Sequence, residues 1–308
     1  MQDSAMQDNK TKIAYSECLR LARTHYENFP TASRLVEKKH RDATAAIYSF
    51  ARRADDIADE GDNTNTQRHA ALDRFSAMLS DAATGKPVDD PTFIALTDTI
   101  KKYHLPLLPF DNLLTAFKLD VDKKRFNSFE ELSFYCQHSA NPVGELILRL
   151  HDKFNATTQA LSNSICTALQ LINFLQDINQ DYQQRDRIYI PLDEMKTFDV
   201  SEMDIQQKAC SANIHQLVDF QLRRATDMLV AGAPLANHLQ GRLKWVMKLT
   251  ILSALSICEQ LSIRNNVFER PSLNKTDWLK IALGSLYFRP DRSHAKIALN
   301  INNRTPTG

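Results

Sequence analysis

Residues 42–60 read DATAAIYSFARRADDIADE and give the clearest indication of how the chain folds. On a helix, side chains three and four residues apart share one face. Tyr48, Arg52, Asp55 and Asp59 are spaced in this way and form one polar stripe. Alanine, isoleucine and phenylalanine cover most of the remaining circumference. The pattern predicts a nearly buried helix that carries a narrow acidic stripe.

A second segment repeats this pattern, because residues 168–182 read ALQLINFLQDINQDY. Its polar stripe consists of Gln170, Asn173, Asp177 and Asp181, and most other positions are strongly apolar. An aspartate pair one turn apart is common on solvated helices, but unpaired carboxylates on a buried helix are costly. Since the arrangement occurs twice, we expect both stripes to face a cavity, a metal ion or a cationic partner.

The rest of the chain is predicted to be helical as well. Short polar or proline-containing connectors separate the apolar segments, and the period-two alternation of strands is almost absent. No linker marks a domain boundary, so we expect a single all-α domain at 13–291, with polar tails at 1–12 and 292–308. The most apolar window, 249–263, contains several polar residues, which favours a buried core helix over a membrane span.

Composition excludes several classes of function. The seven glycines are scattered, and the closest pair, Gly232 and Gly241, cannot form the glycine-rich loop of a dinucleotide-binding motif or a P-loop. A net charge of +1 argues against a nucleic-acid partner. The five cysteines form no CxxC pair, and the amino terminus is polar, which together favour the cytoplasm.

Paired carboxylates offer another way to bind phosphate. Mg²⁺ prefers one or two carboxylates together with waters and phosphate oxygens. Two acidic stripes on facing helices can therefore hold a cluster of Mg²⁺ against a diphosphate without a glycine loop. Such a cluster stabilises the departing diphosphate, so that the substrate carbon can ionise. The arginines that flank the stripes and can neutralise further phosphate charge are Arg52, Arg53, Arg185 and Arg187.

Both acidic motifs resemble those of a known family. DDIAD at 55–59 and DINQD at 177–181 are similar to the two DxxxD motifs of the squalene/phytoene synthase family, the head-to-head trans-prenyl synthases. RIYIP at 187–191 resembles the flap after the second motif, and YCQHSANPVG at 135–144 resembles a segment packed against the prenyl chain. The resemblance covers about residues 15–285. It implies an isoprenoid-synthase helical bundle around a deep apolar cavity, and a Mg²⁺-dependent enzyme without a nicotinamide cofactor.

The resemblance also implies roles for individual residues. The implied Mg²⁺ ligands are Asp55, Asp59, Asp177 and Asp181, with Asp56 as a weaker candidate. The implied diphosphate contacts are Arg52, Arg187 and Tyr189. Arg270 and Lys275 follow the last core helix, where they either close over the phosphates or face solvent.

Two further groups of residues have implied roles. Tyr48 and Asn173 lie on the polar stripes and are the candidate catalytic residues, which orient diphosphate or water. Ala140, Val143 and Gly144 are expected either to shape a prenyl tunnel or simply to pack one helix on another.

Departures from the family pattern point to one branch of it. Residues 25–29 read HYENF, where a His-Ser-Lys-Ser-Phe-like stretch is usual, so a lysine and two serines that face one diphosphate are missing. Gln176 stands where an arginine usually precedes the second motif, and no tyrosine occurs between 190 and 286. These features resemble the bacterial hydroxysqualene synthases of hopanoid-linked squalene synthesis, which convert presqualene diphosphate and water into hydroxysqualene and diphosphate.

Two alternatives stay open. The first alternative is a synthase that condenses two prenyl diphosphates, such as farnesyl diphosphate, to presqualene diphosphate, squalene or phytoene. The second is a non-catalytic family member that acts as an assembly factor. The expected partner is a prenyl diphosphate and not a nucleic acid. Because such substrates are greasy, peripheral contact with the inner membrane and with the neighbouring enzymes of the squalene pathway is a further hypothesis.

Overall fold

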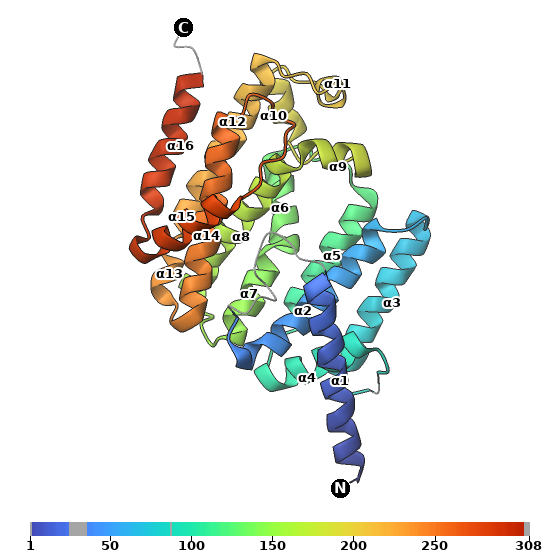
Figure 1. Ribbon diagram of the computed structural model, residues 1–308. Helices are drawn as coiled ribbons and strands as arrows, with labels where there is room; N and C mark the ends of the chain where they lie inside the picture. Colours follow the sequence, from blue (N-terminus) through green and yellow to red (C-terminus); the bar gives the residue numbers. More distant parts are fainter. Residues whose placement is uncertain (1, 25–35, 87, 305–308) are drawn as a thin grey trace. The chain divides into compact units, whose positions relative to one another are not determined.

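The computed structural model describes residues 2–24, 36–86 and 88–304 and is helical almost throughout (Figure 1). Its described residues contain no strand, and a lone parallel bridge pairs Arg125 with Ile188. The all-α fold expected from the sequence is therefore confirmed. The chain forms two compact units, which are considered one at a time, and the number of independently folding domains stays a prediction.

The first unit comprises Met1–Asp122, Pro142–Asn155 and Gly241–Val246. Its helices are α1 (Gln2–Thr24), α2 (Lys38–Asp59), α3 (Asn65–Ala83), α4 (Pro91–Tyr103), α5 (Leu108–Asp122) and most of α7 (Asn141–Leu150). Helix α2 packs against α1, α3, α4 and α5. Four phenylalanines from α2, α3, α4 and α5 fill the centre, where Phe50 lies 5.1 Å from Phe75 and 5.4 Å from Phe110 between ring centroids. This core fixes the helix that carries the first acidic motif.

The second unit comprises Lys123–Asn141, Ala156–Gln240 and Met247–Gly308. Its helices are α6 (Phe129–Ser139), α8 (Ala156–Gln176), α9 (Ile178–Arg185), α10 (Leu192–Thr197), α11 (Glu202–Gln206), α12 (Ala212–Gly232), α13 (Leu235–His238), most of α14 (Gly241–Ile263), α15 (Lys275–Tyr287) and α16 (Pro290–Arg304). Helix α12 lies along α8, which leads into the second acidic motif, and α16 lies along α12 (Figure 1).

The close approach of α8 and α12 depends on one glycine. A Cβ added at Gly232 would lie 2.5 Å from Cγ1 of Ile165 and 2.8 Å from the backbone oxygen of Leu161. Backbone at that distance leaves no room for a methyl group, so the end of α12 requires glycine to reach α8. The turn of α8 that contains Leu161 and Ile165 is thereby held against α12.

The helices extend beyond the boundaries expected from the sequence. Residues assigned to polar tails at 1–12 and 292–308 are helical as far as they are described, because α1 begins at Gln2 and α16 ends at Arg304. Ile297 and Ile301, one turn apart on α16, are each only 1% exposed. Two buried isoleucines thus stabilise a helix whose overall composition is polar.

The apolar window at 249–263 lies in α14, as expected. Ile251, Leu255, Cys258 and Leu261 are fully buried there. By length and composition alone α14 could also cross a membrane, with a mean hydropathy of 1.4 and 44% of its apolar window buried. Core helices of soluble proteins have the same properties.

Candidate functional site

The first acidic motif forms an arginine-centred cluster at the end of α2. One terminal nitrogen of Arg52 lies 3.3 Å from the Asp55 carboxylate, and the other lies 2.6 Å from Asp56 and 2.8 Å from Glu60. We call Arg52, Asp55, Asp56, Asp59 and Glu60 the α2 cluster. Its carboxylates gather at the carboxyl end of a helix whose last turn contains no basic residue. The helix dipole disfavours negative charge at that end, so the cluster favours a bound cation.

The second acidic motif differs from the expectation in one respect. The sequence predicts a continuous helix over 168–182, but α8 ends at Gln176 and α9 begins at Ile178. Asp177 lies between them with φ −107° and ψ 14°. The backbone N–H of Asp181 still donates to the carbonyl of Asp177 at 2.8 Å, so both aspartates remain one turn apart. Asp181 lies in the first turn of α9, where the helix dipole favours a carboxylate.

An arginine from far along the chain neutralises the second motif. The guanidinium of Arg270, in the connection between α14 and α15, donates through both Nε and a terminal nitrogen to the two oxygens of Asp177. Its hydrogen bond to Asp177, assisted by the charges of Asp177 and Asp181, raises the pKa of Arg270. The structure thus brings Arg270 to the second motif, whereas Lys275 lies exposed at the start of α15.

Gln176 holds the connection that carries Arg270. Its buried side-chain amide donates to the carbonyl of Pro271 at 3.1 Å. Arg264 joins the same two segments, because its guanidinium donates to the carbonyl of Leu175 at 3.0 Å and to that of Glu269 at 2.8 Å. The glutamine that replaces the usual arginine therefore has a structural partner in the backbone.

Arg187 and Tyr189 lie on the segment that follows α9. The backbone N–H of Arg187 donates to the carbonyl of Asp181 at 3.1 Å, and the arginine is 5% exposed. The ring of Tyr189 stacks on Phe174, with centroids 3.8 Å apart and an angle of 6° between planes. Phe126 and Tyr135 lie against the same ring. The segment therefore packs directly beside the second motif, and an aromatic cluster holds it there.

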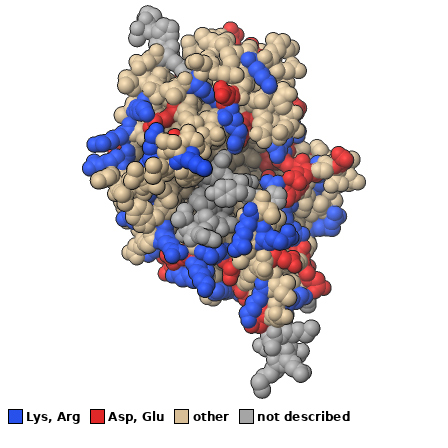
Figure 2. Space-filling model, viewed as in Figure 1, with Lys and Arg blue, Asp and Glu red and all other residues tan. Residues whose placement is uncertain are grey.

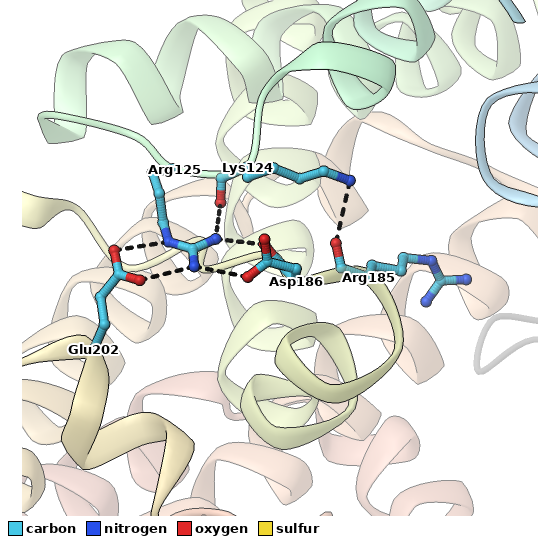
Figure 3. Close-up of polar contacts among 5 residues, drawn as sticks. All are labelled: Lys124, Arg125, Arg185, Asp186 and Glu202. Carbon is cyan, nitrogen blue, oxygen red and sulfur yellow. Dashed lines mark hydrogen bonds and ion pairs between the residues drawn. The ribbon is translucent and has the colours of Figure 1, made fainter. Parts of the chain in front are cut away.

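A polar clamp around Arg125 fixes this segment from the other side (Figure 3). Its guanidinium donates to both oxygens of Glu202, at 2.9 and 2.8 Å, and to the carboxylate of Asp186 at 2.9 Å. It also donates to the carbonyls of Asp186 and Lys124, while the Lys124 amine donates to the carbonyl of Arg185 at 3.2 Å. The hydrogen bond to Glu202, opposed by burial and reinforced by Asp186, raises the pKa of Arg125.

Backbone pairing completes the clamp. The N–H of Ile188 donates to the carbonyl of Lys124 at 3.0 Å, and that of Leu192 donates to the carbonyl of Phe126 at 2.9 Å. Sequence reasoning missed this clamp, because the partners of Arg125 lie 61 and 77 residues away. No local pattern joins positions so far apart.

The other expected site residues have the following places. Tyr48 lies on α2 and is partly buried against a core cluster that contains alanines from both α1 and α2. Asn173 lies half-buried on α8, one turn before Asp177. Arg53 does not join the α2 cluster, since it binds Asp90 at 2.6 Å.

The residues expected to line a prenyl tunnel lie at the junction between α6 and α7. Ala140 follows the end of α6, and Val143 and Gly144 lie in the first turn of α7. All three are half-buried. Their contact with a prenyl chain stays a prediction, and residues 25–29, where the sequence departs from the family, lie outside the described residues.

The donor chemistry of both motifs fits Mg²⁺. Nowhere in the described part of the chain do three or more His, Cys, Asp or Glu side chains gather around one metal position. The carboxylates of the α2 cluster do not converge on one metal position in this way, and the second motif offers only Asp177 and Asp181. Mg²⁺ takes few protein ligands when phosphate and water supply the others. In this structure Arg52 and Arg270 contact carboxylate oxygens that a metal ion would bind. A metal ion would therefore have to displace these arginines from the oxygens.

Comparisons with known proteins cover most of the chain. The family model described as squalene/phytoene synthase matches residues 22–277. A hydroxysqualene synthase of Rhodopseudomonas palustris is 32% identical over 87% of this chain and 91% of its own length. Another, of Zymomonas mobilis, is 31% identical over 83% of this chain and 86% of its own length. The crystal structure of a squalene synthase, HpnC, from Alicyclobacillus acidocaldarius is 32% identical, with a TM-score of 0.77, over 85% of this chain and 97% of that one.

Proposed function

Because the chain belongs to the squalene/phytoene synthase family, whose members process prenyl diphosphates, we propose that it is a hydroxysqualene synthase. The reaction proposed converts presqualene diphosphate and water into hydroxysqualene and diphosphate. The observation that carries the proposal is the pair of arginine-neutralised aspartate motifs, on α2 and at the α8–α9 junction. The curated relatives of the same name support the choice of reaction.

The carboxylates of both motifs have one role in this proposal. Asp55 and Asp59 on α2, and Asp177 and Asp181 at the second motif, would hold Mg²⁺. When bound, Mg²⁺ supplies Lewis-acid neutralisation of the diphosphate charge.

The basic and aromatic side chains bind and orient the substrate. Arg52, Arg187 and Arg270 would contact the diphosphate, because a guanidinium pairs with two phosphate oxygens at once. The rings of Tyr189 and Phe174 stack on each other beside the second motif. An aromatic face stabilises a positive charge near it, and apolar rings keep bulk water away from that charge. Tyr48 and Asn173 are proposed to orient the diphosphate or the water that captures the cation.

Gln176 favours this reaction over a full condensation. Its buried amide is bound to the backbone of Pro271, so this position supplies no cation to a second diphosphate. An enzyme that takes one preformed presqualene diphosphate requires fewer phosphate contacts than one that binds two prenyl diphosphates together. The second candidate function is such a condensing synthase, which the solved squalene synthase of similar fold supports.

A product assay separates the candidates. Purified protein is incubated with Mg²⁺ and either presqualene diphosphate or farnesyl diphosphate, and the lipid is identified by mass spectrometry. Hydroxysqualene from presqualene diphosphate, with no product from farnesyl diphosphate, is expected. Product from farnesyl diphosphate alone would refute the proposed reaction, and no product from either would favour the non-catalytic assembly factor.

Substitutions test the proposed metal role. Asp55→Asn and Asp177→Asn should each abolish turnover while leaving the circular-dichroism spectrum unchanged, and chelation of divalent ions should do the same. Asp62→Asn, an exposed aspartate just beyond the first motif, is the matched control and should remain active. Full activity of either motif variant would contradict the assignment.

The setting of the enzyme is part of the proposal. We propose that it works in the cytoplasm, at the inner membrane, between the enzymes that supply presqualene diphosphate and consume hydroxysqualene in hopanoid-linked squalene synthesis. The scattered cysteines of the chain support the cytoplasmic location, and the apolar nature of the substrate supports contact with the membrane. Fractionation of cells that express the tagged protein tests the location.

A further inference from the structure

Helix α15 (Lys275–Tyr287) turns its apolar side outward. Five of its large apolar side chains are exposed: Trp278 by 39%, Leu279 by 61%, Leu283 by 57%, Leu286 by 59% and Tyr287 by 81%. At 100° per residue these five positions fall within one half of the helix circumference. We call them the α15 face. A surface helix of a soluble protein normally buries such a face and exposes its polar side.

The orientation of α15 is fixed by its opposite, narrow side. Ile281 and Ser285 are buried. Gly284 lies against Leu252 of α14, because a Cβ added at Gly284 would lie 3.7 Å from the Leu252 side chain. The amine of Lys248 on α14 donates to the carbonyl of Ser285 at 3.2 Å. Gly284 and Ser285 thus contact α14 on the side where Ile281 is buried, and the leucines remain outside.

The start of the helix is equally well defined. Asn274 and Asp277 form a capping box, in which the Asn274 side chain accepts from the Asp277 N–H at 2.9 Å and the Asp277 carboxylate accepts from the Asn274 N–H at 3.0 Å. Gln260 of α14 donates to the same carboxylate at 3.3 Å. The exposure of the α15 face is therefore a property of a capped helix that is attached along its length.

Basic side chains, which we call the basic rim, lie on α15 and just after it. Lys275 and Lys280 lie exposed on the helix, and Arg289 and Arg292 lie exposed just after it. The one acidic side chain within α15, Asp277, is engaged in the capping box. In Figure 2, blue Lys and Arg side chains gather together with tan ones on the side where α15 and α16 lie in Figure 1.

We propose that the α15 face is a docking surface for an anionic lipid membrane, with leucine and aromatic side chains in the interface and the four basic residues against the headgroups. A helix with Trp and Leu on one side and Lys or Arg beside it is typical of proteins that lie in the membrane interface. Anionic headgroups complement the basic rim. A second copy of the chain fits less well, because a symmetric dimer through this face would bring the two basic rims together.

Vesicle flotation tests the proposal without reference to catalysis. The protein is mixed with vesicles of phosphatidylglycerol and phosphatidylcholine in equal parts, or with vesicles of phosphatidylcholine alone. Binding to the anionic vesicles is expected. The double variant Leu283→Glu/Leu286→Glu should reduce it by at least about tenfold. Met203→Glu, at an exposed apolar position on α11 in the same unit, is the matched control and should bind like the parent protein.

The charged rim has its own test. Lys280→Glu/Arg289→Glu should weaken binding to the anionic vesicles by about tenfold and flatten its dependence on salt. Equal binding of parent and variant to both kinds of vesicle would overturn the electrostatic part of the proposal.

Fluorescence reports on the α15 face itself. Trp245 and Trp278 are the two tryptophans of the chain, so Trp245→Phe leaves Trp278 as the sole emitter. Its emission should shift to shorter wavelength when anionic vesicles are added, because the indole leaves water. Absence of both flotation and spectral shift overturns the proposal. The proposal is also overturned if the parent protein binds no vesicles and forms a dimer in analytical ultracentrifugation, and if Leu283→Glu/Leu286→Glu dissociates that dimer.

Discussion

Replacing Arg125 by methionine should lower the free energy of unfolding by about 2 kcal/mol. Methionine keeps the unbranched stem of the side chain and removes only the guanidinium. The carboxylates of Asp186 and Glu202 are 70% and 46% exposed, so their ion pairs with Arg125 are screened by water. Together these pairs contribute about 1 kcal/mol. The hydrogen bonds to the carbonyls of Asp186 and Lys124 add about 1 kcal/mol more, since a charged donor serves two backbone acceptors.

The same substitution should also reduce activity. Arg125 holds the segment that carries Arg187 and Tyr189, and a loosened segment presents these side chains correctly for less of the time. We expect kcat/KM for diphosphate release from presqualene diphosphate to fall roughly tenfold. Urea unfolding followed by circular dichroism measures the first effect, with an unchanged m-value, and steady-state kinetics measure the second.

Arg125→Lys is the control that separates charge from geometry. Lysine keeps the positive charge but cannot bridge Glu202 and Asp186 with a planar fork, so its effect should lie between those of arginine and methionine. A methionine variant whose unfolding free energy stays within about 0.5 kcal/mol of the parent would refute the reasoning, because that is the range of ordinary surface substitutions.

Three further predictions concern single residues. Arg270→Gln should raise KM for the prenyl diphosphate by about tenfold. The unfolding midpoint should stay nearly unchanged, because the ion pair that the substitution removes is partly exposed. An unchanged KM in steady-state kinetics would contradict this prediction. Gly232→Ala should lower the unfolding free energy by about 1–3 kcal/mol in urea titrations, although alanine is the better helix former. A more stable variant would disprove the close approach of α8 and α12. Burial, and then the charge of His40, lowers the pKa of His151 from 6.5 to about 4. The unfolded chain therefore binds more protons, and stability should fall as the pH drops from about 6.5 to about 4; His151→Asn should flatten that dependence, which urea titrations at several pH values would show.

The sequence was sufficient for the parts of the site that local spacing determines. Arg52, Asp55 and Asp59 share one helix face, and their spacing of three and four residues predicts this. The same holds for Asn173 on α8 and Asp177 directly after it, since the two are four residues apart and about one helical turn separates them. The all-α class followed from similar periodicity along the whole chain, because apolar residues at helical spacing recur between the connectors.

What the sequence could not predict depends on contacts between distant segments. The break of the helix at Asp177 coincides with an ion pair to Arg270, 93 residues away. Gln176 differs from the family pattern, but its partner, the carbonyl of Pro271, has no sequence signature, since every residue has a carbonyl. The extension of α16 was missed for a related reason, because two isoleucines in a polar segment indicate a helix only once a packing partner is known.

The α2 cluster has a consequence for the local dynamics of its helix. Four carboxylates at the carboxyl end of α2 oppose the helix dipole and repel one another. Arg52, which pairs with three of them, and Arg68, which donates to the carbonyls of Ile57, Glu60 and Gly61, offset only part of that charge. The last turn of α2 should therefore open more often than the rest of the helix, and its amides should exchange their hydrogens faster. A divalent cation bound there would close the turn and slow the exchange. The end of this helix would then report cation binding by itself, in the absence of any substrate.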